Sequence, residues 1–207
     1  MNKWLVSVSI ALALATGGVH AAGGDAAAGK TKSALCMACH GPDGNSPTPA
    51  GPGATWPKLA GQHAGYLAKQ MADFKSQARM DPIMMGMVAA LSEQDMADLA
   101  AYYSSQNQST GTADADQVEA GEKMFRAGNT ETGVAACMAC HGPAGLGNPA
   151  ANFPRISGQH AAYTEKALKD FRSGARANDV GKMMQGVAAK MSDEEISAVS
   201  QYIQGLR

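Results

Sequence analysis

The chain has 207 residues, with 17 Lys and Arg against 18 Asp and Glu, so its formal net charge at pH 7 is −1. Without a basic excess or a basic stripe, the sequence lacks the electrostatic footprint of a nucleic-acid binder, and we expect no nucleic-acid partner. Aromatic residues make up only 5% of the chain, which is little apolar surface for the cores of small domains.

Residues 1–21 have the features of a secretory signal peptide. Lys3 provides the positive start, and the apolar run from Trp4 to Ala15 is too short to span a membrane comfortably. Val19 and Ala21 are small residues at the positions that define a cleavage site. We therefore expect export and cleavage near Ala21, with an uncleaved anchor as the alternative. No later stretch approaches a membrane span, which predicts a soluble mature protein.

A Cys-x-x-Cys-His motif occurs twice, at Cys36–His40 and at Cys137–His141. Two thiols at this spacing can add to the two vinyl groups of one porphyrin, and the adjacent imidazole can bind the iron. The two motifs contain all four cysteines of the chain, so none remains for a disulfide. The sequence predicts two covalently bound haem c groups, attached through Cys36, Cys39, Cys137 and Cys140, with His40 and His141 as iron ligands.

The same cysteine pairs could instead belong to a zinc site or a thioredoxin-like redox site. Zinc ribbons usually place their two pairs some 15–20 residues apart. Here 97 positions separate Cys39 from Cys137 (137 − 39 − 1). Both pairs are followed at once by His, and no further zinc ligands lie near either pair. The motifs therefore favour haem attachment.

The second half of the chain repeats the first. The haem motifs are offset by 101 positions, and the stretch Pro57–His63 returns 97 positions later as Pro154–His160. The drift of a few residues indicates loop-length changes between two copies of one domain. A polar stretch at 104–117 separates the copies. We predict domains at 22–107 and 118–207, joined by a linker at 108–117.

Each copy is predicted to be helical, because apolar residues recur at helical spacing and no alternating β-branched run is present. Helical openings are expected at 25–39 and 117–127, and a helix at 63–76. Capping boxes at Ser92-x-x-Asp95 and Ser192-x-x-Glu195 announce the last helix of each copy. Gly- and Pro-rich loops at 41–57 and 142–154 suit backbone wrapped around a prosthetic group. The predicted fold is all-α, with two tandem domains that are each wrapped around a haem.

The sixth iron ligand separates an electron carrier from a catalyst. Thirteen methionines prevent a choice from composition, but the repeat helps. When Ser92 is aligned with Ser192, Met84 and Met184 are the only methionine pair that the two copies of the loop share. The alternative is that Met84 and Met184 only fill gaps in the hydrophobic core. The repeated His63 and His160 leave bis-His ligation open, although their place after Gly-Gln at a helix start suits a surface or capping role.

The tandem Cys-x-x-Cys-His domains, each with a Pro-x-(Leu/Ile)-x-Gly stretch and a later Met loop, resemble the dihaem cytochrome c4 family. The resemblance covers essentially the whole mature chain, and each half resembles a class I cytochrome c domain. It implies helical domains that face each other, with their haems close together at the interface. It also implies that the carbonyl groups of Pro57 and Pro154 orient the proximal histidines and tune their basicity.

The resemblance further implies Met84 and Met184 as axial ligands, although Met85 and Met87 crowd Met84 in the first copy. It implies periplasmic electron transfer from a quinol-oxidising bc complex towards a terminal oxidase. With both axial positions filled, neither iron readily binds peroxide or oxygen, so we expect an electron carrier and not an enzyme. The expected partners are redox proteins, with no small-molecule substrate, and the expected state is a monomer.

Two other functions stay open at this point. An electron-transfer subunit of a dehydrogenase complex would use the same chemistry with a different partner. A dihaem peroxidase would need one open iron site and a nearby acid/base group, and the sequence singles out no distal His or Glu. Loose association with a membrane surface is also left open.

Overall fold

The computed structural model describes residues 23–47 and 56–207. The predicted signal peptide, its cleavage near Ala21 and part of the first Gly/Pro-rich loop lie outside these residues. Within them the regular secondary structure is helical, and the two β-bridges, Asn129–Val134 and Asn148–Phe153, are isolated. The all-α prediction is confirmed. No helix in the described part of the chain is long and apolar enough to cross a membrane.

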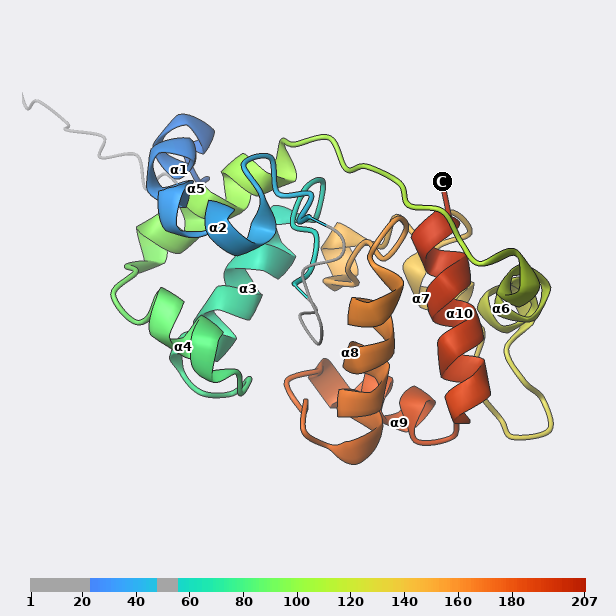
Figure 1. The fold of residues 1–207 in the computed structure, drawn as a ribbon. Coiled ribbons are helices and arrows are strands. Elements are labelled where there is room, and N and C mark those ends of the chain that lie inside the picture. The colour runs from blue at the N-terminus through green and yellow to red at the C-terminus, as the bar shows by residue number, and fades with distance from the viewer. Residues whose placement is uncertain (1–22, 48–55) are drawn as a thin grey trace, which may run out of the picture.

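Two helical bundles lie side by side, joined by an extended segment between α5 and α6 (Figure 1). The first bundle contains α1 (Ala26–Lys32), η1 (Ser33–Leu35), α2 (Met37–His40), α3 (Ala64–Lys75), α4 (Pro82–Val88) and α5 (Glu93–Ser104). The second contains α6 (Ala115–Ala127), α7 (Met138–His141), η2 (Pro149–Ala151), α8 (Ala161–Ser173), η3 (Val180–Lys182), α9 (Met183–Ala188) and α10 (Asp193–Gly205).

Both predicted capping boxes are present. The Ser92 hydroxyl accepts a hydrogen bond from the Asp95 backbone N–H at 3.1 Å, and the Asp95 carboxylate accepts one from the Ser92 N–H at 2.9 Å. The same reciprocal pair links Ser192 and Glu195 at 3.2 and 2.9 Å. These bonds satisfy N–H groups that a helix start leaves without intrahelical partners.

The first and last helices of each bundle cross at a glycine. A Cβ atom added at Gly29 in α1 would lie 2.0 Å from the carbonyl oxygen of Asp98 in α5. One added at Gly121 in α6 would lie 2.2 Å from the carbonyl oxygen of Ala198 in α10. Since no side chain fits at either position, glycine permits this close approach of the two backbones. The shared crossing shows that both halves fold in the same way.

Each bundle has its own hydrophobic core, and each core reaches the haem motif. Leu67, Leu99 and Tyr103 belong to the first core, against which Cys36 packs. The second core gathers residues from α6, α8 and α10, and Cys137 packs against it. The haem motifs therefore lie at the edge of apolar surface, where a porphyrin would extend the small cores.

A buried carboxylate anchors the first domain and has no counterpart in the second, where Ala198 takes its place. Asp98 is 3% exposed, and its carboxylate accepts hydrogen bonds from Lys32 Nζ at 2.6 Å, the Asp25 backbone N–H at 2.8 Å and Gln94 Nε2 at 2.7 Å. The side chain of Lys32, followed by the Asp25 N–H, lowers the pKa of Asp98 to about 2.

This carboxylate should make the first domain acid-sensitive. Because its pKa in the folded state lies below the ordinary value of 3.8, it stabilises the fold above about pH 4, and that stabilisation is lost as the pH falls towards about 2. Asp98→Ala should lower the urea midpoint of the first domain at neutral pH and flatten its dependence between about pH 4 and pH 2. An unchanged dependence on pH in that range would contradict this assignment.

Candidate haem-binding site

His40, at the end of α2, has the geometry of a proximal ligand. Gly41 follows with a φ of 77° and ends the helix. The ring is buried, and its Nδ1 lies 2.9 Å from the carbonyl oxygen of Pro57. Since a carbonyl can only accept, Nδ1 carries the proton and Nε2 keeps its lone pair. Burial lowers the pKa of His40, which favours the neutral ring that metal binding requires.

The second domain repeats this arrangement. His141 ends α7 before Gly142, whose φ is also 77°. Its Nδ1 lies 2.9 Å from the carbonyl oxygen of Pro154, and burial lowers its pKa. Both His–Pro contacts that the family resemblance implied are therefore present in the structure.

In each motif the first cysteine, Cys36 or Cys137, is the N-cap residue of a short helix, and the second, Cys39 or Cys140, lies inside that helix. Burial raises the pKa of Cys36 and raises that of Cys137 to about 11. A zinc site would need thiolates and further ligands. Within residues 23–47 and 56–207 no group of three or more His, Cys, Asp or Glu side chains is placed to hold a metal ion. Two thiols followed by an imidazole are the donors that covalent haem attachment requires.

Met84 and Met184 lie on short helices and not in the loops that the sequence suggested. Asp81 caps α4 and accepts a hydrogen bond from the Met84 backbone N–H at 3.0 Å, with Pro82 at the first helical position. Pro is pre-organised for that position, which explains the helix. Met184 lies in α9 and packs against the second core.

Two of the neighbouring methionines, Met87 and Met183, are more exposed than Met84 and Met184. Met87 is 38% exposed and Met183 is 46% exposed, whereas Met84 and Met184 are half-buried. Met85 is also half-buried. Its counterpart is Gln185, so the repeat continues to distinguish the pair formed by Met84 and Met184.

His63 and His160 occupy the N-cap positions of α3 and α8, but neither side chain caps its helix. His63 Nε2 lies 2.9 Å from the carbonyl oxygen of Leu146 in the other domain. His160 is buried, and burial, together with the charge of Lys58, lowers its pKa. The expected surface or capping role is therefore wrong for His160. Because the ring of His63 is directed to the second domain, the geometry does not support bis-His ligation of an iron in the first domain.

A reciprocal pair of amide clamps joins the segments 57–62 and 154–159, whose prolines contact His40 and His141. Gln62 donates to the carbonyl of Arg155 at 2.7 Å and accepts from the Arg155 N–H at 2.9 Å. Gln159 donates to the carbonyl of Lys58 at 3.0 Å and accepts from its N–H at 2.9 Å. Lys58 and Arg155 directly follow Pro57 and Pro154 in these segments. The clamps therefore fix these two segments relative to each other.

Four cations line the junction without a carboxylate partner among the described residues. Lys58 and Arg176 are buried, and the ammonium group of Lys58 binds the carbonyl of Ser109 at 2.7 Å. Arg176 and Arg79 each bind a tyrosine hydroxyl of the opposite domain, at 2.9 and 3.0 Å. Arg155 is the fourth cation. None of the four belongs to an ion pair within the described residues. A buried cation requires compensation, and here the carbonyl oxygen of Ser109 and the hydroxyl oxygen of Tyr66 contact the two buried cations.

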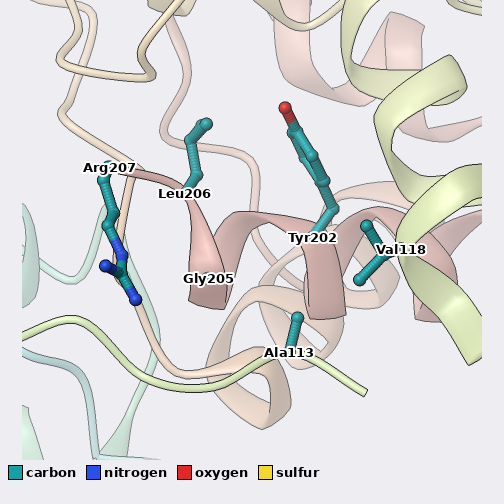
Figure 2. Close-up of a pocket in the computed structure, with 6 residues that line it drawn as sticks. All are labelled: Ala113, Val118, Tyr202, Gly205, Leu206 and Arg207. Carbon is teal, nitrogen blue, oxygen red and sulfur yellow. The ribbon is translucent and has the colours of Figure 1, made fainter. Parts of the chain in front are cut away.

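A shallow hollow at the end of α10 is not part of this site. Ala113, Val118, Tyr202, Gly205, Leu206 and Arg207 line it, with Tyr202 beside Val118 (Figure 2). Its volume is about 260 Å³, and no residue of either haem motif reaches it. The hollow lies where the linker segment passes the C-terminus.

The interface residues are not among those predicted from the sequence. The sequence does contain a signal for these residues. Gln62, Tyr66 and Arg79 all recur 97 positions later, as Gln159, Tyr163 and Arg176. Polar side chains kept in register across a repeat indicate a shared contact, and here that contact is the junction itself.

Comparison with known proteins agrees with this geometry. The cytochrome c family model matches residues 26–107 and 118–207. The chain is 53% identical over 207 residues to cytochrome c4 of Pseudomonas aeruginosa, covering all of both chains. It is 40% identical over 171 residues to a thiosulfate dehydrogenase electron acceptor of Stutzerimonas stutzeri (strain A1501), covering 81% of this chain and 76% of that protein.

Among solved structures, reduced recombinant cytochrome c4 from Pseudomonas stutzeri superposes with a TM-score of 0.84 at 50% identity, covering 89% of this chain and 100% of that one. The fold, the two haem motifs and the oriented histidines all support the same family assignment. The chain belongs to the cytochrome c family and, within it, to the dihaem cytochromes c4, which are electron carriers with two covalently bound haem c groups.

Proposed function

We propose that this protein is a periplasmic shuttle that takes electrons from a quinol-oxidising bc complex and delivers them to a terminal oxidase. The observation that carries the proposal is the pair of oriented histidines whose loops the amide clamps join. This junction ties the two segments that contact the histidines directly to each other. The predicted signal peptide supports export.

In this proposal Cys36, Cys39, Cys137 and Cys140 hold the haems through thioethers. His40 and His141 bind the irons through Nε2, and the carbonyls of Pro57 and Pro154 fix their tautomer. Each haem, when bound, supplies a one-electron couple. The protein's part is to fill the axial positions, exclude water and hold the groups in place, so that electron transfer requires little rearrangement.

Met84 and Met184 are proposed as the sixth ligands. They are the half-buried methionine pair that recurs in the repeat, and Met87 and Met183 are more exposed. A thioether favours ferrous iron and raises the potential. In the first domain Met85 is the competitor, and the hydrogen bond from the Met84 backbone to Asp81 fixes the start of the helix that carries both.

A second candidate is the electron acceptor of a dehydrogenase, favoured by the similarity to proteins named thiosulfate dehydrogenase electron acceptors. The two roles differ in the electron donor. Reduction of the purified protein by a bc complex with quinol, compared with reduction by a thiosulfate-oxidising dehydrogenase, separates them. Faster reduction by the dehydrogenase would replace the first proposal with the second.

The carrier role itself predicts closed iron sites. A redox titration with optical spectra should show two one-electron couples, two haems per chain and low-spin spectra in both oxidation states. The ferrous protein should bind carbon monoxide poorly at neutral pH, because both sixth positions are filled. Rapid binding of one carbon monoxide per chain, or substantial peroxide turnover, would favour the peroxidase.

A further inference from the structure

The two domains hold their candidate sixth ligands differently. Met84 comes five positions after Arg79 (84 − 79), whereas Met184 comes eight positions after Arg176 (184 − 176). The segment before the ligand is therefore three residues longer in the second domain. It includes Gly181 and Lys182, whose φ angles are 64° and 56°, and it ends at α9.

This longer segment reaches across the junction to α3 of the first domain. Asn178 donates through Nδ2 to Gln70 Oε1 at 3.0 Å and to the carboxylate of Asp73. Its own carbonyl accepts a hydrogen bond from Lys69 Nζ at 3.0 Å. Arg176 Nη2 also binds Gln70 Oε1, at 3.1 Å. Gln70 is 7% exposed, so the anchor is protected from competing water.

The mirror-image anchor is missing from the described residues. The counterpart of Gln70 is Ala167, which has no polar group to offer. The counterpart of Asp73 is Asp170, which pairs with Lys166 in its own helix. Asp81, before Met84, caps its own helix. The first domain's segment reaches α8 through the hydrogen bond from Arg79 to Tyr163.

The residue after Asn178 connects this anchor to the ligand-bearing helix. The carboxylate of Asp179 accepts from the Gln185 backbone N–H at 3.1 Å and from Gln185 Nε2 at 2.7 Å. Gln185 directly follows Met184. One residue therefore binds the first domain while its neighbour binds the turn that carries the candidate ligand.

We propose that Asn178, held by Gln70 and Asp73 of the first domain, is a positioning residue for Met184. The sixth ligand of the second haem is then held in part by the contacts of Asn178 with the other domain. In the described residues, the segment before Met84 has only the hydrogen bond from Arg79 to Tyr163 across the junction. The inference rests on the proposed ligation by Met184. Hydrogen bonds to a partly buried carboxylate are among the stronger ones in proteins. A ligand segment that loses such an anchor opens more often.

Imidazole competition tests the proposal on the full-length holoprotein, because imidazole displaces a weakly held thioether from ferric iron. Met184→Ala first assigns the near-infrared methionine–iron band of the second haem. Asn178→Ala and Asp73→Ala are then compared with Asp170→Ala, the matched control. Asp73 and Asp170 occupy the same repeat position and each pairs with a lysine one turn earlier, but Asp73 also binds Asn178.

Asn178→Ala and Asp73→Ala should raise the imidazole affinity of the second haem about tenfold, which corresponds to about 1.4 kcal/mol. The first haem and the Asp170→Ala variant should keep the affinity of the unaltered protein. Unchanged affinity in Asn178→Ala and Asp73→Ala, or equal gains at both haems, would overturn the inference and leave the ligand assignment standing. A methionine–iron band that keeps its full intensity in Met184→Ala would instead overturn the ligand assignment, and this inference with it.

Discussion

Met84→Ala and Met184→Ala should each remove about half of the near-infrared methionine–iron band of the oxidised protein, because each variant loses one of two thioether ligands. The midpoint potential of the affected haem should fall by on the order of 0.1 V or more, since axial ligands set haem potentials over a span of about 0.8 V. The other haem should change much less. The altered iron should also gain carbon monoxide binding, because its sixth position opens.

The chain offers matched controls for this experiment. Met85→Ala and Met87→Ala should leave the band largely intact and cost at most packing stability. Met87 is 38% exposed, so its loss should be the milder of the two. If Met85→Ala abolishes the first-domain band while Met84→Ala spares it, the ligand is displaced by one residue. The assignment in the second domain would then need its own test.

Gly29→Ala and Gly121→Ala should each destabilise one domain severely. The added Cβ atoms would lie 2.0 and 2.2 Å from backbone carbonyl oxygens of the partner helix, so the helices must separate. Overpacking of a core usually costs about 1–3 kcal/mol. Because backbone atoms cannot move away by a change of rotamer, we expect the free energy of unfolding to fall by about 3 kcal/mol or more. Urea unfolding followed by haem absorbance measures the loss.

Gly65→Ala provides the control for these substitutions. Gly65 also lies in a helix, α3, but an added Cβ atom there would have no neighbour within 4 Å and would meet open space. Because Ala has the higher helix propensity, this change should be neutral or stabilise the protein by up to about 1 kcal/mol. Equal losses at Gly29 and Gly65 would show that the helix crossing is not the cause.

Local signals in the sequence were sufficient for much of the structure. The helices at 63–76 and after Ser92 and Ser192 depend on short-range periodicity and capping, so they appear close to their predicted positions. The linker was harder to delimit. Helix α6 begins at Ala115, inside the predicted segment 108–117, because Asp114 caps it through the Asp116 N–H at 3.2 Å. The domain boundaries themselves stay a prediction.

What the sequence determined by itself is the covalent chemistry and the repeat. Cys-x-x-Cys-His is contiguous, so the spacing of the thiols and imidazole needs no tertiary contact, and an offset of about 100 residues can be read directly from the chain. Only the tertiary structure decided which groups meet at the junction. Gln62 binds a loop 93 residues away, and Asn178 binds a helix 105 residues away. Because such contacts depend on how two folded surfaces pack, local sequence patterns cannot specify them.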